Sequence, residues 1–232
     1  MYLDGLAEDA RKLVSQFVSP VVRHGQDIGL KSVVVWGSAT DREYNRQWNL
    51  IELGFIFCGD SKPDLYSFGN LVHIPSRLWR HFASPLLITD REIATSLDVY
   101  PVEFLNIAST GSVVWGEMDL ASAIKIESQD LRAQVEREWR GLILHARAAL
   151  LGSSLSGKKM ASLLTAATEK FNALGRATVM VLSGETPPRT DAMLDQLAQV
   201  TGGGAVLEKI AGLQSGAESE LSFEEFSMIL SW

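Results

Sequence analysis

The residues best suited to chemistry are a glycine and a serine that follow a short apolar run. Lys31 to Trp36 is rich in β-branched residues, and Gly37 and Ser38 come directly after it. Such a run indicates a β-strand, and a glycine at its end lets the backbone approach another group closely. In phosphate-binding sites that group is a nucleotide tail, because a bend without a Cβ leaves its N–H groups exposed. Gly37 and Ser38 are therefore candidate nucleotide-binding residues.

A second apolar run, Trp48 to Cys58, follows after a polar stretch. The order of apolar strand, Gly-Ser, spacer and second strand resembles the nucleotidyltransferase fold of the DNA polymerase β superfamily. The resemblance implies a second strand that begins with two carboxylates two residues apart. Alternation along a strand places both on one face, where they hold Mg²⁺ against the nucleotide phosphates.

The positions that match these carboxylates read Trp-Asn-Leu-Ile-Glu-Leu, from 48 to 53. If Asn49 takes the first acidic position, the second is Ile51; if Glu52 takes the second, the first is Leu50. Either register leaves at most one acid, whereas two-metal phosphoryl transfer needs several anionic oxygens around the cations. Asn49 and Glu52 are candidate metal ligands, and Glu52 is also a candidate catalytic residue. We therefore expect a nucleotidyltransferase fold whose metal centre has been lost.

A third apolar run, Val99 to Ala108, is expected to form a strand, and Thr110 to Glu117 a further short strand. The two runs, VYPVEFLNIA and TGSVVWGE, resemble a set of predicted bacterial nucleotidyltransferases. The resemblance implies that Glu103 is the third metal-binding carboxylate, a candidate catalytic and metal-binding residue. The alternative is that Glu103 lies at the rim of a half-exposed strand and pairs with an arginine or a lysine.

Other chemistry finds less support in the sequence. Asp41 and Glu43 lie in the polar stretch after Ser38 and could supply a displaced ion site, but a solvated loop is the simpler explanation. The four histidines fall at no metal-ligand spacing. The glycines from 202 to 204 follow a predicted helix, so we expect them to end that helix and not to bind phosphate.

Composition limits the class of protein and its partners. The 232 residues, 46% of them apolar and 21% charged, are typical of a globular chain with one large domain or two small ones. The formal charge of −7 makes nucleic acid an unexpected partner. Cys58, the single cysteine, is expected to be a buried, inert thiol in a reducing cytoplasm. No run reaches the roughly 18 apolar residues of a membrane span or has the pattern of a signal peptide, so we expect a cytoplasmic protein without membrane contact.

Helical spacing accounts for most of the remaining chain. Helices are expected over residues 3–23, 64–82, 90–97, 127–151, 158–182, 190–200, 205–212 and 221–232, with a short apolar segment at 85–89. The expected fold class is α+β. A small mixed β-sheet of nucleotidyltransferase type, flanked by helices, would occupy residues 1–125, and an antiparallel helical bundle would occupy residues 126–232.

Three hypotheses for function follow. The first is a catalytically degenerate nucleotidyltransferase-fold protein that acts as a nucleotide-binding or protein-interaction module, with a nucleotide, a protein partner or a second copy of the chain as candidate partners. The second is an active nucleotidyltransferase that moves a nucleotidyl group from an NTP to a small molecule or protein, using Glu52, Glu103 and Asp41 as an altered carboxylate set. Mg²⁺ and ATP are expected cofactors only in that case. The third is a purely structural partner whose interdomain cleft is filled.

Overall fold

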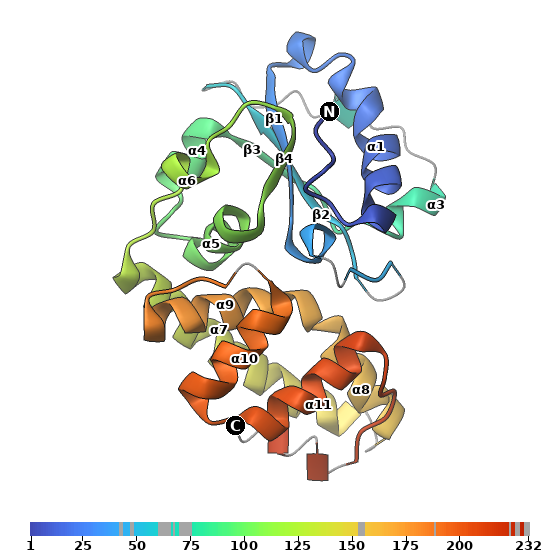
Figure 1. Ribbon diagram of the computed structural model, residues 1–232, viewed down its shortest axis with the longest axis vertical. Coiled ribbons are helices and arrows are strands. Elements are labelled where there is room, and N and C mark those ends of the chain that lie inside the picture. Colours follow the sequence, from blue (N-terminus) through green and yellow to red (C-terminus); the bar gives the residue numbers. More distant parts are fainter. Residues whose placement is uncertain are drawn as a thin grey trace. The chain divides into compact units, whose positions relative to one another are not determined.

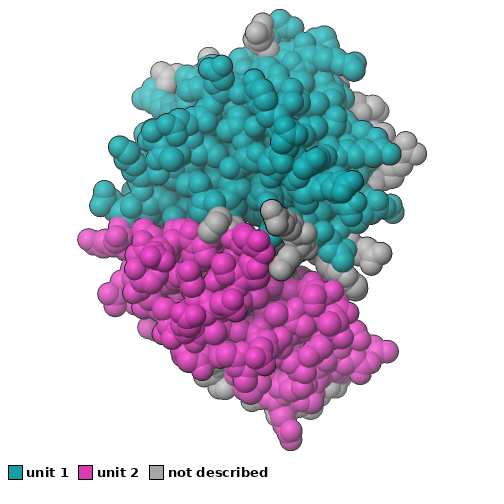
Figure 2. Space-filling view, viewed as in Figure 1, with its two compact units in different colours: residues 1–127 teal, residues 128–232 magenta. Residues whose placement is uncertain are grey.

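The computed structural model divides the chain into two compact units, residues 1–127 and 128–232 (Figure 2). The residues that it describes are 1–41, 44–46, 49–59, 66, 68–69, 76–152, 156–187, 189–222, 224–225 and 228–229. Each unit has its own apolar core.

A mixed β-sheet of four strands forms the centre of the first unit among the described residues. The strands are β1 (Leu30–Trp36), β2 (Glu52–Phe57), β3 (Leu86–Thr89) and β4 (Ser112–Gly116). Their order across the sheet is β3-β2-β1-β4; β1 is antiparallel to both β2 and β4, and β2 is parallel to β3. This confirms the expected small mixed sheet, and the segment at 85–89 supplies its edge strand.

Helices cover both faces of this sheet (Figure 1). On one face lies α1 (Glu8–Val22), which buries a stripe that includes Val14, Phe17 and Val21 against alternate residues of β1 and β2. Pro20 lies near the end of α1, which continues for two further residues. On the other face lie α4 (Asp90–Thr95), α5 (Pro101–Thr110) and α6 (Leu120–Ala123). Successive strand residues therefore face two different apolar cores, as the alternation of a β-strand requires.

The expectation of a strand from Val99 to Ala108 is wrong, because this segment contains helix α5. Pro101 occupies the first helical turn, where its fixed φ suits a helix and no N–H is needed. Phe104 and Ile107, three residues apart, pack on the sheet. A continuous apolar run of this length fits a buried strand and a buried helix equally well, so the pattern alone could not distinguish them.

The prediction of a buried Cys58 is also wrong, since the side chain is exposed. The strand β2 ends at Phe57, one residue earlier than expected, and Cys58 lies just beyond the sheet with its N–H bonded to the Gly29 carbonyl at 2.9 Å. The predicted helix over 64–82 falls largely outside the described residues, which include α3 (Ser76–Trp79).

Helices make up the second unit among its described residues. They are α7 (Ser128–Gly152), α8 (Gly157–Ala166), α9 (Thr168–Ser183), α10 (Thr190–Thr201) and α11 (Gly204–Ser215). The single long helix expected over 158–182 is divided at Ala167, which separates α8 from α9. Gly202 ends α10 with a φ of 72°, a conformation that favours glycine, as the sequence predicted. The expected piece at 221–232 lies partly outside the described residues.

The apolar core of this unit joins α9, α10 and α11 and includes Phe171, Met193, Leu197, Leu207 and Ile210. None of the helices in the described part of the chain combines the length and the apolarity that crossing a bilayer would need.

Candidate functional site

The Gly-Ser bend leaves the end of β1 as a short 3₁₀ turn, Gly37–Thr40. Gly37 has a φ of 70°, so the bend needs a residue without a Cβ. Its N–H donates to the Thr110 Oγ1 of α5 at 2.9 Å, and the same hydroxyl donates to the Asn106 carbonyl at 2.7 Å. Ser38 is 7% exposed. The N–H that the sequence suggested for a phosphate is therefore bonded to a side chain of this protein.

Glu52 lies beside this bend. It is the first residue of β2, it is half-buried, and its Cα pairs with that of Trp36, the last residue of β1. The structure thus brings Gly37, Ser38 and Glu52 to one end of the β1–β2 pair. In the sequence, only the resemblance linked these three candidate residues. In the structure they are neighbours because β1 and β2 pair in an antiparallel register.

The pattern of buried residues in β2 shows which side chains lie on the same face of the sheet as Glu52. Ile51 is 0% exposed and belongs, with Leu53 and Phe55, to the core on the α1 side of the sheet. Alternation directs Glu52 to the opposite face. Ile51 therefore does not share the face of Glu52, and Leu50, which precedes the first residue of β2, is 43% exposed.

Asn49 takes part in a local turn. Its N–H donates to the Asn45 carbonyl at 2.8 Å, and its Oδ1 accepts a hydrogen bond from the Asn45 N–H at 3.0 Å. The one oxygen that Asn49 could offer to a cation thus already accepts a hydrogen bond that stabilises the loop before β2.

Glu103 lies in the first turn of α5 and is exposed. Its position is seven residues before Thr110, the residue that contacts Gly37, which corresponds to roughly 10 Å along the helix axis. The resemblance placed this carboxylate on a strand, but the strand beside β2 is β3, whose four residues are Leu, Leu, Ile and Thr. The described part of β3 therefore supplies no carboxylate to the end of the sheet where Glu52 lies.

The carboxylate that follows β3 has a structural role at the other end of the sheet. Asp90 Oδ2 accepts a hydrogen bond from Lys31 Nζ at 2.8 Å, and Oδ1 accepts one from the Gly59 N–H at 2.9 Å. The Lys31 ammonium, followed by the Gly59 N–H, lowers the pKa of Asp90 below its usual value. Asp90 joins the start of β1 to the segment after β2. Because β2 and β3 are parallel, this is the end remote from Glu52.

The face of the sheet next to Glu52 is closely packed. The ring of Trp36 lies across Gly54, where a Cβ would come within 3.1 Å of the indole. The space left between this face and α4, α5 and α6 is about 10 Å³, less than one water molecule needs. The only sequence signal for this close packing was a tryptophan at the end of one strand and a glycine in the next, and we did not predict the packing from it.

The candidate metal-binding residues do not provide the several oxygen ligands that a pair of Mg²⁺ ions needs. In the described ranges no three His, Cys, Asp or Glu side chains come together in a way that could hold a metal ion. Asp41 is 6% exposed, its N–H donates to the Ser38 carbonyl, and its carbonyl accepts from the Tyr44 N–H. Glu43 lies outside the described residues.

A mixed sheet with a Gly-Ser bend, followed by a helical unit, is the arrangement of a nucleotidyltransferase-like fold, and this chain has that fold. One solved structure with a similar fold is that of a spectinomycin adenyltransferase, AAD(9) from Enterococcus faecialis, which is similar over 95% of each chain with a TM-score of 0.54. The two sequences are 10% identical, so this likeness shows the fold alone. No protein-family model and no curated protein matches the chain.

Proposed function

We propose that this chain is a catalytically degenerate nucleotidyltransferase-fold protein that acts by binding, as a module for a nucleotide or a protein partner. The observation that carries the proposal is that Glu52 is the only acid at the start of β2. Leu50 stands two residues before it in the chain, and a leucine side chain has no oxygen to offer a hard cation. A single glutamate cannot anchor the pair of metal ions that in-line nucleotidyl transfer requires.

The engaged Gly-Ser bend supports the same proposal. A phosphate that approached the bend would have to compete with Thr110 for the Gly37 N–H. Any nucleotide bound there would therefore be held by hydrogen bonds and packing and not by a metal bridge. Its affinity would be independent of Mg²⁺.

The alternative is an active, Mg²⁺-dependent nucleotidyltransferase that acts on a small molecule or a protein. The likeness to a spectinomycin adenyltransferase solved with ATP and spectinomycin favours it. Such an enzyme would depend on Glu52, Glu103 and Asp41 as an altered carboxylate set, with one of them accepting the proton of the acceptor hydroxyl.

Calorimetric titration of the full chain with ATP, with and without Mg²⁺, separates the two functions when it is combined with an assay for pyrophosphate release. The degenerate protein shows the same ATP affinity in both conditions, or none, and releases no pyrophosphate above the buffer rate. Pyrophosphate release that needs Mg²⁺ and is lost in Glu52→Gln would overturn the proposal. Asp98→Asn, which changes an exposed carboxylate elsewhere in the same unit, is the matched control.

A further inference from the structure

The second unit contains a cavity of about 650 Å³. Helices α7 to α11 supply its walls, and a residue beyond α11 completes them. The principal apolar residues that line it are Leu142, Ala149, Leu164, Phe171, Leu197 and Ile229. A volume of this size lies within the range of about 300–1,000 Å³ in which small-molecule sites fall.

Several polar side chains around the cavity are bonded within the unit, and the exposed His145 also lines it. Trp139 Nε1 donates to Thr178 Oγ1 at 2.9 Å, and Lys170 Nζ lies 2.6 Å from Glu138 Oε2. Near the opposite wall, Gln214 Nε2 donates to Asn172 Oδ1 at 3.1 Å. These bonds leave the wall with a mainly hydrocarbon surface, which gives water few partners.

We propose that this cavity is a binding site for an uncharged, mainly apolar small molecule. Binding of an apolar ligand in the cavity is favourable because it removes apolar surface of the ligand and of the cavity wall from water. A dry apolar cavity of roughly 150 Å³ is enough to bind benzene, so this cavity has room for a ligand several times larger. A charged ligand would lose hydration against a lining that is mainly hydrocarbon.

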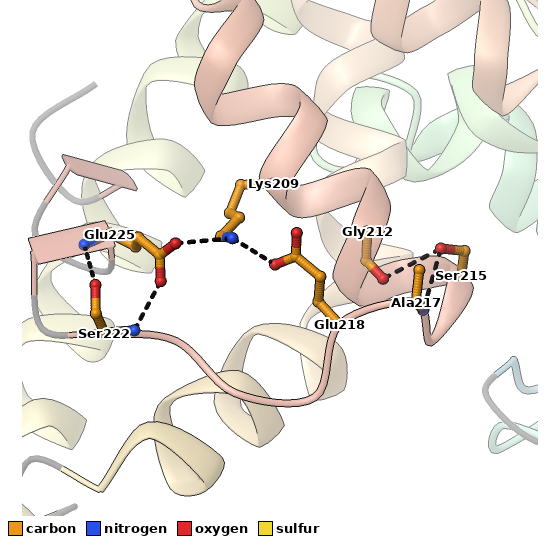
Figure 3. Close-up of polar contacts among 7 residues, drawn as sticks. All are labelled: Lys209, Gly212, Ser215, Ala217, Glu218, Ser222 and Glu225. Carbon is orange, nitrogen blue, oxygen red and sulfur yellow. Dashed lines mark hydrogen bonds and ion pairs between the residues drawn. The ribbon is translucent and has the colours of Figure 1, made fainter.

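The wall that contains Ile229 is held in place by an ion-pair cluster. Lys209 of α11 lies between Glu218, at 2.8 Å, and Glu225, at 2.7 Å, as Figure 3 shows. Ser222 and Glu225 exchange hydrogen bonds at 2.7 and 3.1 Å, which join these two residues to each other four positions before Ile229. The chain after α11 is therefore fixed to that helix on both sides of Leu221, which packs on Met160 of α8. This wall of the cavity is built into the fold.

The test uses phenylnaphthylamine, an uncharged apolar fluorophore, with the full-length chain. Energy transfer from tryptophan should show saturable binding of one molecule per chain, and the NMR signal of the Trp139 indole N–H should shift in step with it. Anilinonaphthalene sulfonate, a charged relative, should bind at least roughly ten-fold more weakly, about 1.4 kcal/mol in free energy. Equal binding of both probes would overturn the assignment of an uncharged ligand.

Two alanines of α7 provide a matched pair of variants. Ala149 lines the cavity and Ala148 is exposed beside it. Ala149→Phe fills the space and should weaken phenylnaphthylamine binding by roughly ten-fold or more, while Ala148→Phe should leave it within about two-fold. Unchanged binding in Ala149→Phe would overturn the proposal. If that variant does not fold, a Trp139 indole signal in the wild-type chain that fails to shift at saturation has the same meaning.

Discussion

The end of β1 and the interior of the helical unit differ in what occupies them. At the end of β1, Thr110 binds the Gly37 N–H and the ring of Trp36 lies across Gly54, leaving about 10 Å³ between the sheet and its helices. In the helical unit about 650 Å³ lies among side chains that show no motif. The Gly37 N–H of the bend is thus bonded within the protein and the sheet face beside it is closely packed, while the helical unit, which carries no resemblance, has room for a ligand.

The contrast shows that a motif and a site can separate. A strand, a glycine bend and a second strand are needed to build the sheet, whether or not a ligand binds beside them. Free volume depends on the sizes of side chains that meet from five helices. Packing therefore determines where a ligand fits, even where the scaffold suggests another place.

The largest expected effect is on the free energy of unfolding, and it comes from placing a larger side chain in each region. Gly54→Val should lower the free energy of unfolding by about 2–3 kcal/mol, because the new side chain meets the Trp36 ring and Leu86 in a packed layer. Ala149→Phe, which adds more volume to the cavity, should change it by less than about 1 kcal/mol. Urea unfolding followed by circular dichroism measures both. Equal losses in the two variants would remove the contrast between the regions.

The next effect concerns the engaged bend. Thr110→Val removes the hydroxyl that accepts from the buried Gly37 N–H, so it should cost about 1–2 kcal/mol of stability. Thr110→Ser keeps the hydroxyl and should cost less than about half as much. Thermal unfolding of both variants checks this. A serine variant as unstable as the valine variant would show that packing of the threonine methyl, and not the hydrogen bond, holds the bend.

A smaller effect tests whether a second carboxylate near Glu52 creates a metal site. Leu50→Asp would place a second acid two residues before Glu52 in the chain, and Mn²⁺ affinity should rise roughly ten-fold, equivalent to about 1.4 kcal/mol. Leu50→Asn is the control, because it has a similar shape without the charge. Calorimetric titration with Mn²⁺ measures the difference. No gain over Leu50→Asn would mean that the packed sheet face excludes the ion whatever acids surround it.

The sequence predicted the β1 and β2 strands and most of the helices because β-branched runs and helical spacing are local signals. It could not decide between Asn49 and Glu52 as the aligned acid position, since alternation alone allows both; the structure adds that Ile51 is buried and Glu52 is half-buried. It placed Glu103 on a strand because the apolar run that contains it has no helical period. Nothing in the sequence indicates the cavity. An apolar stripe predicts that a helix face is buried, but it does not predict how closely the neighbouring side chains pack against that face.

The smallest effect compares the ion pairs that fasten each unit, Lys31 with Asp90 in the first and Lys209 with Glu225 in the second. The hydrogen bond from Lys31, and then that from the Gly59 N–H, depresses the pKa of Asp90 in the folded chain. Stability from this carboxylate is therefore fully present above the usual aspartate pKa of about 3.9, and it is lost as the pH falls through the depressed value.

The side chains of Lys31 and Asp90 are 39% and 31% exposed, so solvent screening limits the contribution of their pair to at most about 1 kcal/mol. Asp90→Asn should therefore lower stability slightly near neutral pH, and this effect should shrink as the pH falls through the depressed pKa of Asp90. Glu225→Gln should show the same direction, because Lys209 depresses the pKa of Glu225 in the same way. Denaturant midpoints measured across this pH range check both variants. If the loss in Asp90→Asn persisted undiminished at low pH, the hydrogen-bond geometry at Gly59 and not the charge on Asp90 would be what joins β1 to the end of β2.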